Sequence, residues 1–143
     1  MRKPKWLSIE MVVAIHDAAL AAFGGAAGVR DAGLLKSALA RAQQRLHDDA
    51  KADLFALAAA YGVGIAKNHP FVDGNKRTAL LSARALLFLN RWIFEPSEAE
   101  EVQVMLDVAT SGIDAGAFGD WLRANSRRQR AAARTRDNPA KLI

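Results

Sequence analysis

The chain has 143 residues, enough for one compact domain that folds without a disulfide or a structural metal. Ala, Leu, Arg and Glu dominate and strand-forming residues are sparse, so the composition favours an all-helical protein. No cysteine is present, which excludes a disulfide framework, a thiolate metal site and a cysteine nucleophile.

No segment of the sequence is typical of secretion or of a membrane span. The basic N-terminal residues are not followed by an apolar stretch, so they do not resemble a signal peptide. The most apolar run, residues 54 to 66, is shorter than the roughly 20 residues that a membrane-spanning helix needs. We therefore expect a soluble cytoplasmic protein with no membrane partner.

The formal net charge of +5 is concentrated at one end of the chain. Six of the 20 Lys and Arg residues lie in 127–143, where Asp137 is the only acidic residue, and the rest of the chain is balanced. This pattern predicts a neutral domain over residues 1–126 and a basic, flexible tail over 127–143. The body of the domain is accordingly not expected to bind nucleic acid.

Apolar periodicity and capping residues predict three helices in the first half of the chain. Ser8 is a favourable N-cap for the first helix, which Gly24 ends. Asp31 can cap the second helix. The third, from about 52 to 68, is apolar almost all round, which is typical of a central helix enclosed by others.

Two features of the third helix have expected structural consequences. Gly62 and Gly64 lie among residues that are strong candidates for burial, so we expect them to allow a neighbouring helix to approach closely. Pro70 restricts the preceding residue to an extended conformation. The helix should therefore end near His69 and leave that side chain facing a loop.

The second half of the chain predicts three more helices. One runs from about 75 to 90, and a short extended segment near 92–95 follows it, as one arm of a small hairpin. Ser97 and Glu100 form a capping box for the next helix, and Asp114 can cap the last one. The expected fold is all-α, a single compact bundle of about six helices.

The connection between the third and fourth helices carries an unusual concentration of polar groups. Five ionisable or strongly polar side chains occur within the nine residues 69 to 77, where a plain turn would suffice as a connector. Such a loop predicts a functional site. The candidate residues are His69, Asp73, Gly74, Asn75, Lys76 and Arg77.

Each candidate has a chemical role available. Gly74 tolerates a positive φ, which would let backbone amides turn inward at a helix N-terminus and attract an anion. Asp73 is a suitable ligand for a Mg²⁺ ion that bridges two phosphates, and Lys76 and Arg77 can neutralise phosphoryl oxygens. The imidazole of His69 could accept a proton from an attacking hydroxyl group. Together these groups indicate a nucleotide and a hydroxyl acceptor.

Other polar and aromatic residues have simpler interpretations. Phe71 has polar neighbours, so we expect it to anchor the loop in the core rather than to stack on a base. His16 and His47 lack a comparable setting and are expected to be solvated or locally hydrogen-bonded. The three tryptophans are expected to pack in the core or at its edge.

The segment His69 to Arg77 resembles the signature of the Fic/Doc family, H-P-F-x-D/E-G-N-G-R-x-x-R. Lys76 stands where the signature has its second glycine, and Leu80 stands where it has its final arginine. Both differences resemble the Doc (death-on-curing) branch, whose motif continues as N-K-R-T-A. Further likeness at residues 15–18, 23–25 and 53–55 extends the resemblance to about residues 8–125 but not to the tail.

The resemblance implies a nucleotide-dependent transferase. Fic proteins in general transfer AMP from ATP to a hydroxyl side chain. Members of the Doc branch act as toxins of type II toxin–antitoxin pairs, and as kinases that move the γ-phosphate of ATP to a threonine of elongation factor Tu and arrest translation. The roles implied here are His69 as base and Asp73 as Mg²⁺ ligand. The implied ATP contacts are Lys67, Phe71, Gly74, Asn75, Lys76 and Arg77, with Lys67 the weaker candidate and Phe71 as the loop anchor.

Two alternatives remain open at this stage. The first is an AMP transferase with an atypical motif. The second is a non-catalytic module, either a nucleic-acid binder that uses the basic tail or an inactive Fic fold that serves as a platform for a partner. Many Fic proteins also carry an inhibitory helix with the pattern S/T-x-x-x-E-G/N. The nearest match begins at Ser97 but has Val102 at its last position. We therefore expect a separate antitoxin to supply the blocking helix.

Overall fold

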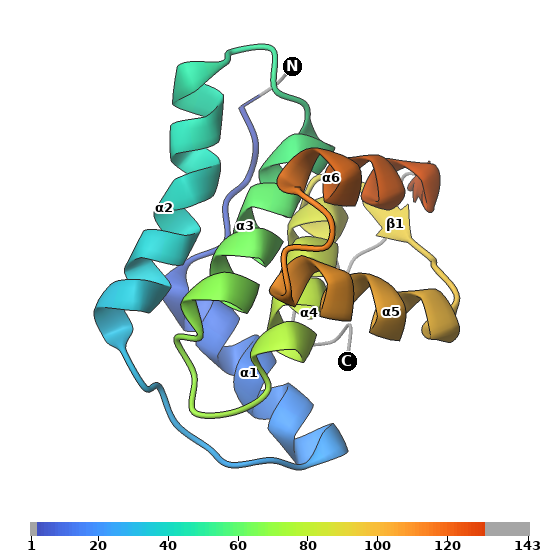
Figure 1. Cartoon of the computed structure of the whole chain (residues 1–143). Helices are drawn as coiled ribbons and strands as arrows, with labels where there is room; N and C mark the ends of the chain where they lie inside the picture. Colours follow the sequence, from blue (N-terminus) through green and yellow to red (C-terminus); the bar gives the residue numbers. More distant parts are fainter. Residues whose placement is uncertain (1–2, 131–143) are drawn as a thin grey trace.

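The computed structural model describes residues 3–130, and in this part of the chain six helices and two short strands follow one another (Figure 1). The all-α fold class, with its short extended segment, is confirmed. No helix among residues 3–130 has the length and apolar character needed to cross a membrane. The elements are α1 (Ile9–Phe23), α2 (Ala32–Asp48), α3 (Leu54–Asn68), α4 (Asn75–Leu89), β1 (Trp92–Phe94), α5 (Glu98–Ala109), α6 (Ala115–Ala124) and β2 (Ser126–Arg128).

The helices begin where the sequence predicts. Ser8, Asp31, Ser97 and Asp114 are the N-caps of α1, α2, α5 and α6, and each side chain accepts a hydrogen bond from the backbone amide three residues later. Each of these bonds satisfies an amide that has no partner within its helix, which is worth about 1 kcal/mol. Gly24, with φ 83°, ends α1 as expected.

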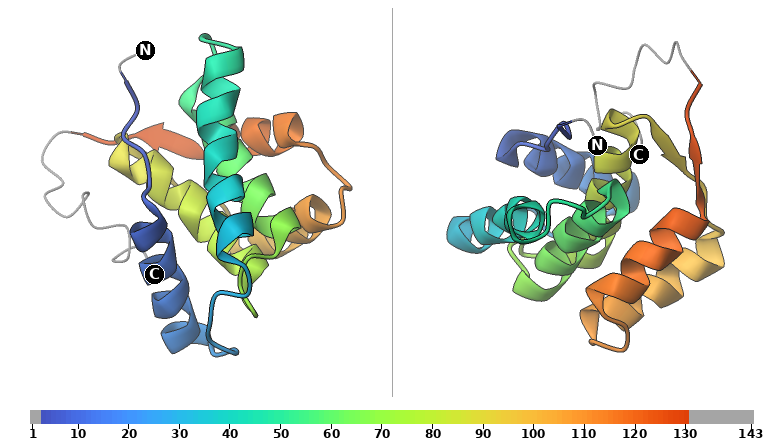
Figure 2. Two further views of the ribbon diagram at one scale, coloured as in Figure 1. Left: turned by 90° about the vertical axis from the view of Figure 1, so that its left-hand side faces the viewer. Right: turned by 90° about the horizontal axis from the view of Figure 1, so that it is seen from above.

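Helix α3 is the centre of the bundle and contacts α2, α4, α5 and α6. The view from above in Figure 2 shows α3 between α2 on one side and the α5–α6 pair on the other. A Cβ atom at Gly64 would lie 3.0 Å from the backbone of Ala38 in α2, and one at Gly62 would lie 2.6 Å from the ring of Phe118 in α6. Both glycines therefore allow the close approach that the sequence predicts.

The strand partner of β1 differs from the expectation of a local hairpin. β1 pairs antiparallel with β2, so that Ile93 lies opposite Arg127, and the helices α5 and α6 separate the two strands in the chain. Arg127 and Arg128, which the sequence analysis assigned to the tail, thus belong to a strand. A three-residue strand with two arginines lacks the apolar alternation that would reveal it. Residues 131–143 of the tail lie outside the described part of the chain.

Two connections lie side by side at one end of the bundle. The α1–α2 connection, residues 24–31, runs antiparallel to the α3–α4 loop, and Val29 and Phe71 form an isolated β-bridge. The amide of Val72 donates to the carbonyl of Gly28 at 3.0 Å, and the amide of Arg30 donates to the carbonyl of Pro70 at 2.7 Å. Backbone hydrogen bonds therefore join the loop that carries the candidate site to the α1–α2 connection, about 40 residues earlier in the chain.

Candidate functional site

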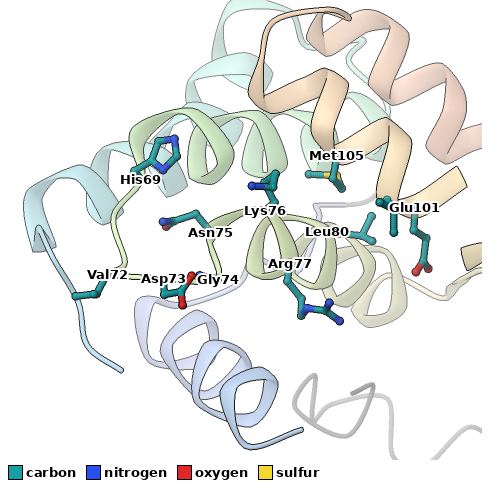
Figure 3. A pocket seen from close by; sticks show the side chains of 11 residues that line it. His69, Val72, Asp73, Gly74, Asn75, Lys76, Arg77, Leu80, Glu101 and Met105 are labelled. Atoms are coloured by element: carbon teal, nitrogen blue, oxygen red, sulfur yellow. Dashed lines mark hydrogen bonds between the residues drawn. The ribbon is translucent and has the colours of Figure 1, made fainter. Parts of the chain in front are cut away.

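A cavity of about 490 Å³ lies between the α3–α4 loop, the first turns of α4 and the facing side of α5 (Figure 3). Its size is within the range of small-molecule sites, roughly 300–1,000 Å³. The lining is polar on the loop side and largely apolar on the α5 side, apart from Glu101. The residues that line it are His69, Val72, Asp73, Gly74, Asn75, Lys76, Arg77, Leu80, Glu101, Val102 and Met105.

His69 is the C-cap of α3, and its exposed side chain contributes to the cavity wall. Its backbone is left-handed, with φ 50° and ψ 55°, and not extended as the following proline predicts. The carbonyl groups at this helix end accept hydrogen bonds from a side chain of another segment. The Nε of Arg30 donates to the carbonyl of His69 at 2.8 Å.

Asp73 presents an exposed carboxylate at the other end of the loop. Its Oδ2 accepts a hydrogen bond from the amide of Ala26 at 3.2 Å, and its Oδ1 accepts one from the amide of Gly74 at 2.8 Å. These two bonds stabilise the ionised form and hold the pKa of Asp73 below its ordinary value. A single ionised carboxylate on a cavity wall is the kind of ligand that Mg²⁺ takes from proteins.

The N-terminus of α4 opens into the same cavity. Gly74 is its N-cap in a left-handed conformation, φ 76°, and no side chain caps this end. An uncapped helix N-terminus presents free amides and the positive end of the helix dipole. Lys76 and Arg77 are exposed in the first turn, and the guanidinium group of Arg77 lies 3.8 Å from the ring centroid of Phe23. This region is suited to bind phosphate oxygens.

Asn75 closes the loop with its side chain. Its Oδ1 accepts from the amide of Phe71 and its Nδ2 donates to the carbonyl of the same residue, both at 3.0 Å. The side chain is 8% exposed, so these bonds are shielded from water. The side chain of Asn75 thus holds the loop in shape, and its backbone amide lies in the first turn of α4, where a phosphate group could bind.

His16 of α1 packs against the α3–α4 loop, a contact that the sequence analysis did not predict. Its ring is 1% exposed and stacks on the ring of Phe71, with centroids 3.9 Å apart and planes within 8°. Its Nε2 lies 2.8 Å from the carbonyl oxygen of Asp73, and because a carbonyl only accepts, Nε2 is the donor. The expectation of a solvated or locally bonded His16 is therefore wrong. Its place on the buried face of α1, between Val12 and Ala19, was the available signal.

A sequence model of the Fic/DOC family matches residues 6–87 of this chain, which include α1 to α4 up to Leu87 and the whole loop. The chain belongs to the Fic/DOC family. It is 38% identical over 120 residues to Protein kinase doc of Escherichia phage P1, an alignment that covers 82% of this chain and 92% of the relative. It is 43% identical over 98 residues to Toxin Doc of Mycolicibacterium smegmatis, covering 65% and 74%. Both relatives place it in the Doc branch.

The structure brings most of the predicted Fic/DOC site residues together. His69, Asp73, Gly74, Lys76 and Arg77 all line the cavity. Two predicted ATP contacts lie elsewhere. The ammonium group of Lys67 contacts the hydroxyl of Ser111 in the α5–α6 connection, and Phe71 is buried beneath the loop against α1, so neither side chain contributes to the cavity wall.

The opposite wall of the Fic/DOC cavity comes from α5, which sequence reasoning did not assign to the site. Glu101, Val102 and Met105 line it, and the carboxylate of Glu101 forms a 2.6 Å ion pair with Arg84 of α4. Glu101 occupies the glutamate position of the incomplete inhibitory pattern. Its ion-pair partner lies one helical turn beyond Leu80, the position where the family signature has its final arginine. The near match to that pattern was the only signal in the sequence.

Proposed function

We propose that this chain is a Doc-like kinase toxin that transfers the γ-phosphate of ATP to a hydroxyl side chain of a cytoplasmic translation factor and thereby arrests translation. The supporting observation is that one cavity is shared by an exposed imidazole, an ionised carboxylate and an uncapped, cationic helix N-terminus. The resemblance to the Doc branch indicates elongation factor Tu as the acceptor, and one relative is itself named a protein kinase.

The proposed reaction assigns a step to each group. The acceptor hydroxyl oxygen attacks the γ-phosphorus as its proton passes to the imidazole of His69. The bond between the γ-phosphorus and its bridging oxygen breaks, and ADP leaves with the electron pair. The α4 amides, Lys76 and Arg77 hold the phosphate oxygens, where their positive charge stabilises the charge that develops on transfer.

Asp73 is the residue that would hold Mg²⁺. Among residues 3–130, no three His, Cys, Asp or Glu side chains form a metal cluster, so the proposed ion would depend on Asp73 together with ATP phosphates and water. When bound, the ion would neutralise part of the charge on the phosphate oxygens. The depressed pKa of Asp73 keeps the carboxylate ionised for this task.

The apolar end of the cavity favours a kinase over an AMP transferase. Leu80, which stands in place of the signature arginine, lines that end, and the nearby Arg84 is already paired with Glu101. The cationic groups are therefore concentrated at Lys76 and Arg77. The cavity therefore lacks the phosphate contact that the signature arginine would make in an AMP-transferring site.

Labelled ATP tests the proposal directly. The purified chain is incubated with elongation factor Tu, Mg²⁺ and ATP that carries its label on either the α- or the γ-phosphate. We expect label to reach the acceptor only from the γ position. Transfer from the α position would establish an AMP transferase instead, and binding without transfer to elongation factor Tu or to a ribosome-containing lysate would indicate a non-catalytic module.

We further propose that a separate antitoxin blocks this cavity in trans, as part of a type II toxin–antitoxin pair. Val102 and Leu106 lie one turn apart on α5, 74% and 46% exposed, and Val102 borders the cavity. Such a stripe can receive the apolar face of an amphipathic helix. Expression of the chain alone should arrest growth, and co-expression of the neighbouring open reading frame should relieve the arrest. Normal growth with the chain alone would contradict the proposal.

A further inference from the structure

Arg30 contacts the end of helix α3 although it lies outside the family motif. Its Nε donates to the carbonyl of His69 at 2.8 Å, and its Nη2 donates to the carbonyl of Asn68 at 3.0 Å. Its backbone amide donates to the carbonyl of Pro70 at 2.7 Å. One residue of the α1–α2 connection thus holds three successive carbonyl groups on both sides of His69.

The backbone conformation of His69 is one that its own sequence disfavours. A left-handed residue other than glycine brings its Cβ close to the following carbonyl oxygen. Residues before proline, moreover, prefer an extended backbone. His69, at φ 50° and before Pro70, goes against both preferences. Contacts from elsewhere in the molecule must therefore hold it there.

The contacts from Arg30 restrain the ψ angle of His69. The ψ angle of His69 sets the direction of its carbonyl group, and the Nε of Arg30 binds that group directly. An extended His69 would turn the carbonyl away from Arg30 and redirect the chain that follows. The φ and ψ angles also fix where the Cα–Cβ bond points, and hence whether the imidazole faces the cavity.

We propose that Arg30 is a positioning residue for His69: its two-pronged contact with the carbonyls of Asn68 and His69 holds the base in the left-handed conformation that directs the imidazole into the cavity. The inference rests on the proposed function, which makes His69 the base. Arginine suits the role because Nε and Nη2 form a rigid fork that binds two acceptors at once. The acceptors are C-terminal carbonyls of α3, which carry the negative end of the helix dipole.

The first test is kinetic and compares Arg30→Ala with Arg30→Lys. Since a misplaced catalytic group can cost about 10²-fold in rate, we expect Arg30→Ala to lower kcat by roughly 10- to 100-fold. The affinity for Mg-ATP, measured by calorimetry, should change less than about threefold, because Asp73, Lys76 and Arg77 are untouched. Arg30→Lys, which keeps the charge but not the fork, should give an intermediate kcat. Guanidinium ion at millimolar concentration should partly restore Arg30→Ala.

A matched control exists in the same region. Arg41 of α2 is also exposed, and its Nη2 reaches the side-chain oxygen of Asn68 at 3.3 Å without contacting the carbonyl of His69. Arg41→Ala should keep kcat within about twofold of the unaltered chain. Equal losses in Arg30→Ala and Arg41→Ala, or an unchanged kcat in Arg30→Ala, would overturn the proposal.

A second readout is independent of activity. The Cα and Cβ chemical shifts of His69, measured by NMR on the full chain without nucleotide, report its backbone conformation. We expect them to move from left-handed toward extended values in Arg30→Ala, and in Arg30→Lys should the alanine variant not fold. Unchanged shifts would overturn the positioning role. If the unaltered chain transfers no label from ATP, the kinase proposal fails, while these shifts still decide whether Arg30 sets the backbone of His69.

Discussion

The two walls of the cavity are built in different ways. The motif wall, residues 69–77, is polar and is fastened by hydrogen bonds to the α1–α2 connection and to α1. The α5 wall is largely apolar, and Val102 on it is 74% exposed. Fixed polar groups suit a surface that performs chemistry, and an exposed apolar stripe suits a surface that binds a partner. Substitutions on the two walls should therefore separate catalysis from partner binding.

The largest effect is expected from His69→Ala on the motif wall. Removing a general base costs about 10²- to 10⁴-fold in rate, so γ-phosphate transfer and toxicity should be abolished. The melting temperature should stay within a few degrees, because the side chain is exposed at a helix end. His47→Ala, at the exposed C-terminal end of α2, is the control and should retain toxicity. Toxicity of His69→Ala at normal expression would remove His69 from the mechanism.

Asp73→Asn is also expected to lower the rate of γ-phosphate transfer, but by less than His69→Ala. The amide can still accept one of the two backbone hydrogen bonds but brings no negative charge, so the Mg²⁺ concentration needed for half-maximal transfer should rise by about tenfold or more. The measurement is a Mg²⁺ titration of the transfer rate. An unaltered Mg²⁺ requirement would show that Asp73 is not the ligand.

The lowered pKa of Asp73 also predicts how stability depends on pH. The pKa is lower in the folded chain than the ordinary value of about 3.9, so the stabilisation is complete above that value and is lost as pH falls through the folded pKa. The difference in unfolding free energy between the unaltered chain and Asp73→Asn should be constant from pH 7 to about pH 5 and shrink only below about pH 4. Urea unfolding over this range checks it, and a difference that shrinks between pH 7 and 5 would contradict the lowered pKa.

An intermediate effect is expected for His16→Phe, which keeps an aromatic ring on Phe71 but removes the donor to the carbonyl of Asp73. That carbonyl loses its buried partner, at a cost of about 1–2 kcal/mol in unfolding free energy. The transfer rate should fall by about tenfold, because the Asp73–Gly74 turn is less well fixed. Denaturant unfolding and the transfer assay measure the two effects. A variant as stable and as active as the unaltered chain would show that stacking alone supports the loop.

The smallest catalytic effect is expected on the α5 wall. Val102→Ala removes exposed apolar surface at the cavity edge and should change the transfer rate by less than about twofold. The same variant should bind the antitoxin severalfold more weakly, because each buried CH2 group lost from the contact costs about 0.8 kcal/mol. Titration calorimetry with the neighbouring gene product measures this. A large loss of transfer with unchanged antitoxin affinity would reverse the roles assigned to the two walls.

Local patterns in the sequence predicted the parts of the molecule that depend on local physics. Helix periodicity and caps such as Ser8 and Asp31 are confirmed, because a cap needs only the amide three residues away. The motif loop was likewise recognised as one cluster from its polar residues alone. The acceptor, the antitoxin and the catalytic roles of these residues stay predictions.

The features that were missed depend on contacts between distant segments. The carbonyl of the left-handed His69 is bound by Arg30, 39 residues earlier, and the buried ring of His16 stacks on Phe71. β2 forms only because α5 and α6 return the chain to β1. Glu101 reaches the site through the packing of α5 on α4. The buried face of α1 and the near match that begins at Ser97 pointed to His16 and Glu101, but a sequence pattern does not identify the distant partner in such a contact.

The side chain of Asn75 bears on how activity is inferred for other members of the family. It accepts from the amide of Phe71 at Oδ1 and donates to the carbonyl of Phe71 at Nδ2; a carboxylate would have no proton to give, and a hydroxyl has a single oxygen for both tasks. The shape of the loop therefore favours asparagine whether or not catalysis takes place. A family member without activity would still favour an asparagine at the position of Asn75 but would not need a histidine at the position of His69. The histidine is therefore a better indicator of catalytic activity than the asparagine.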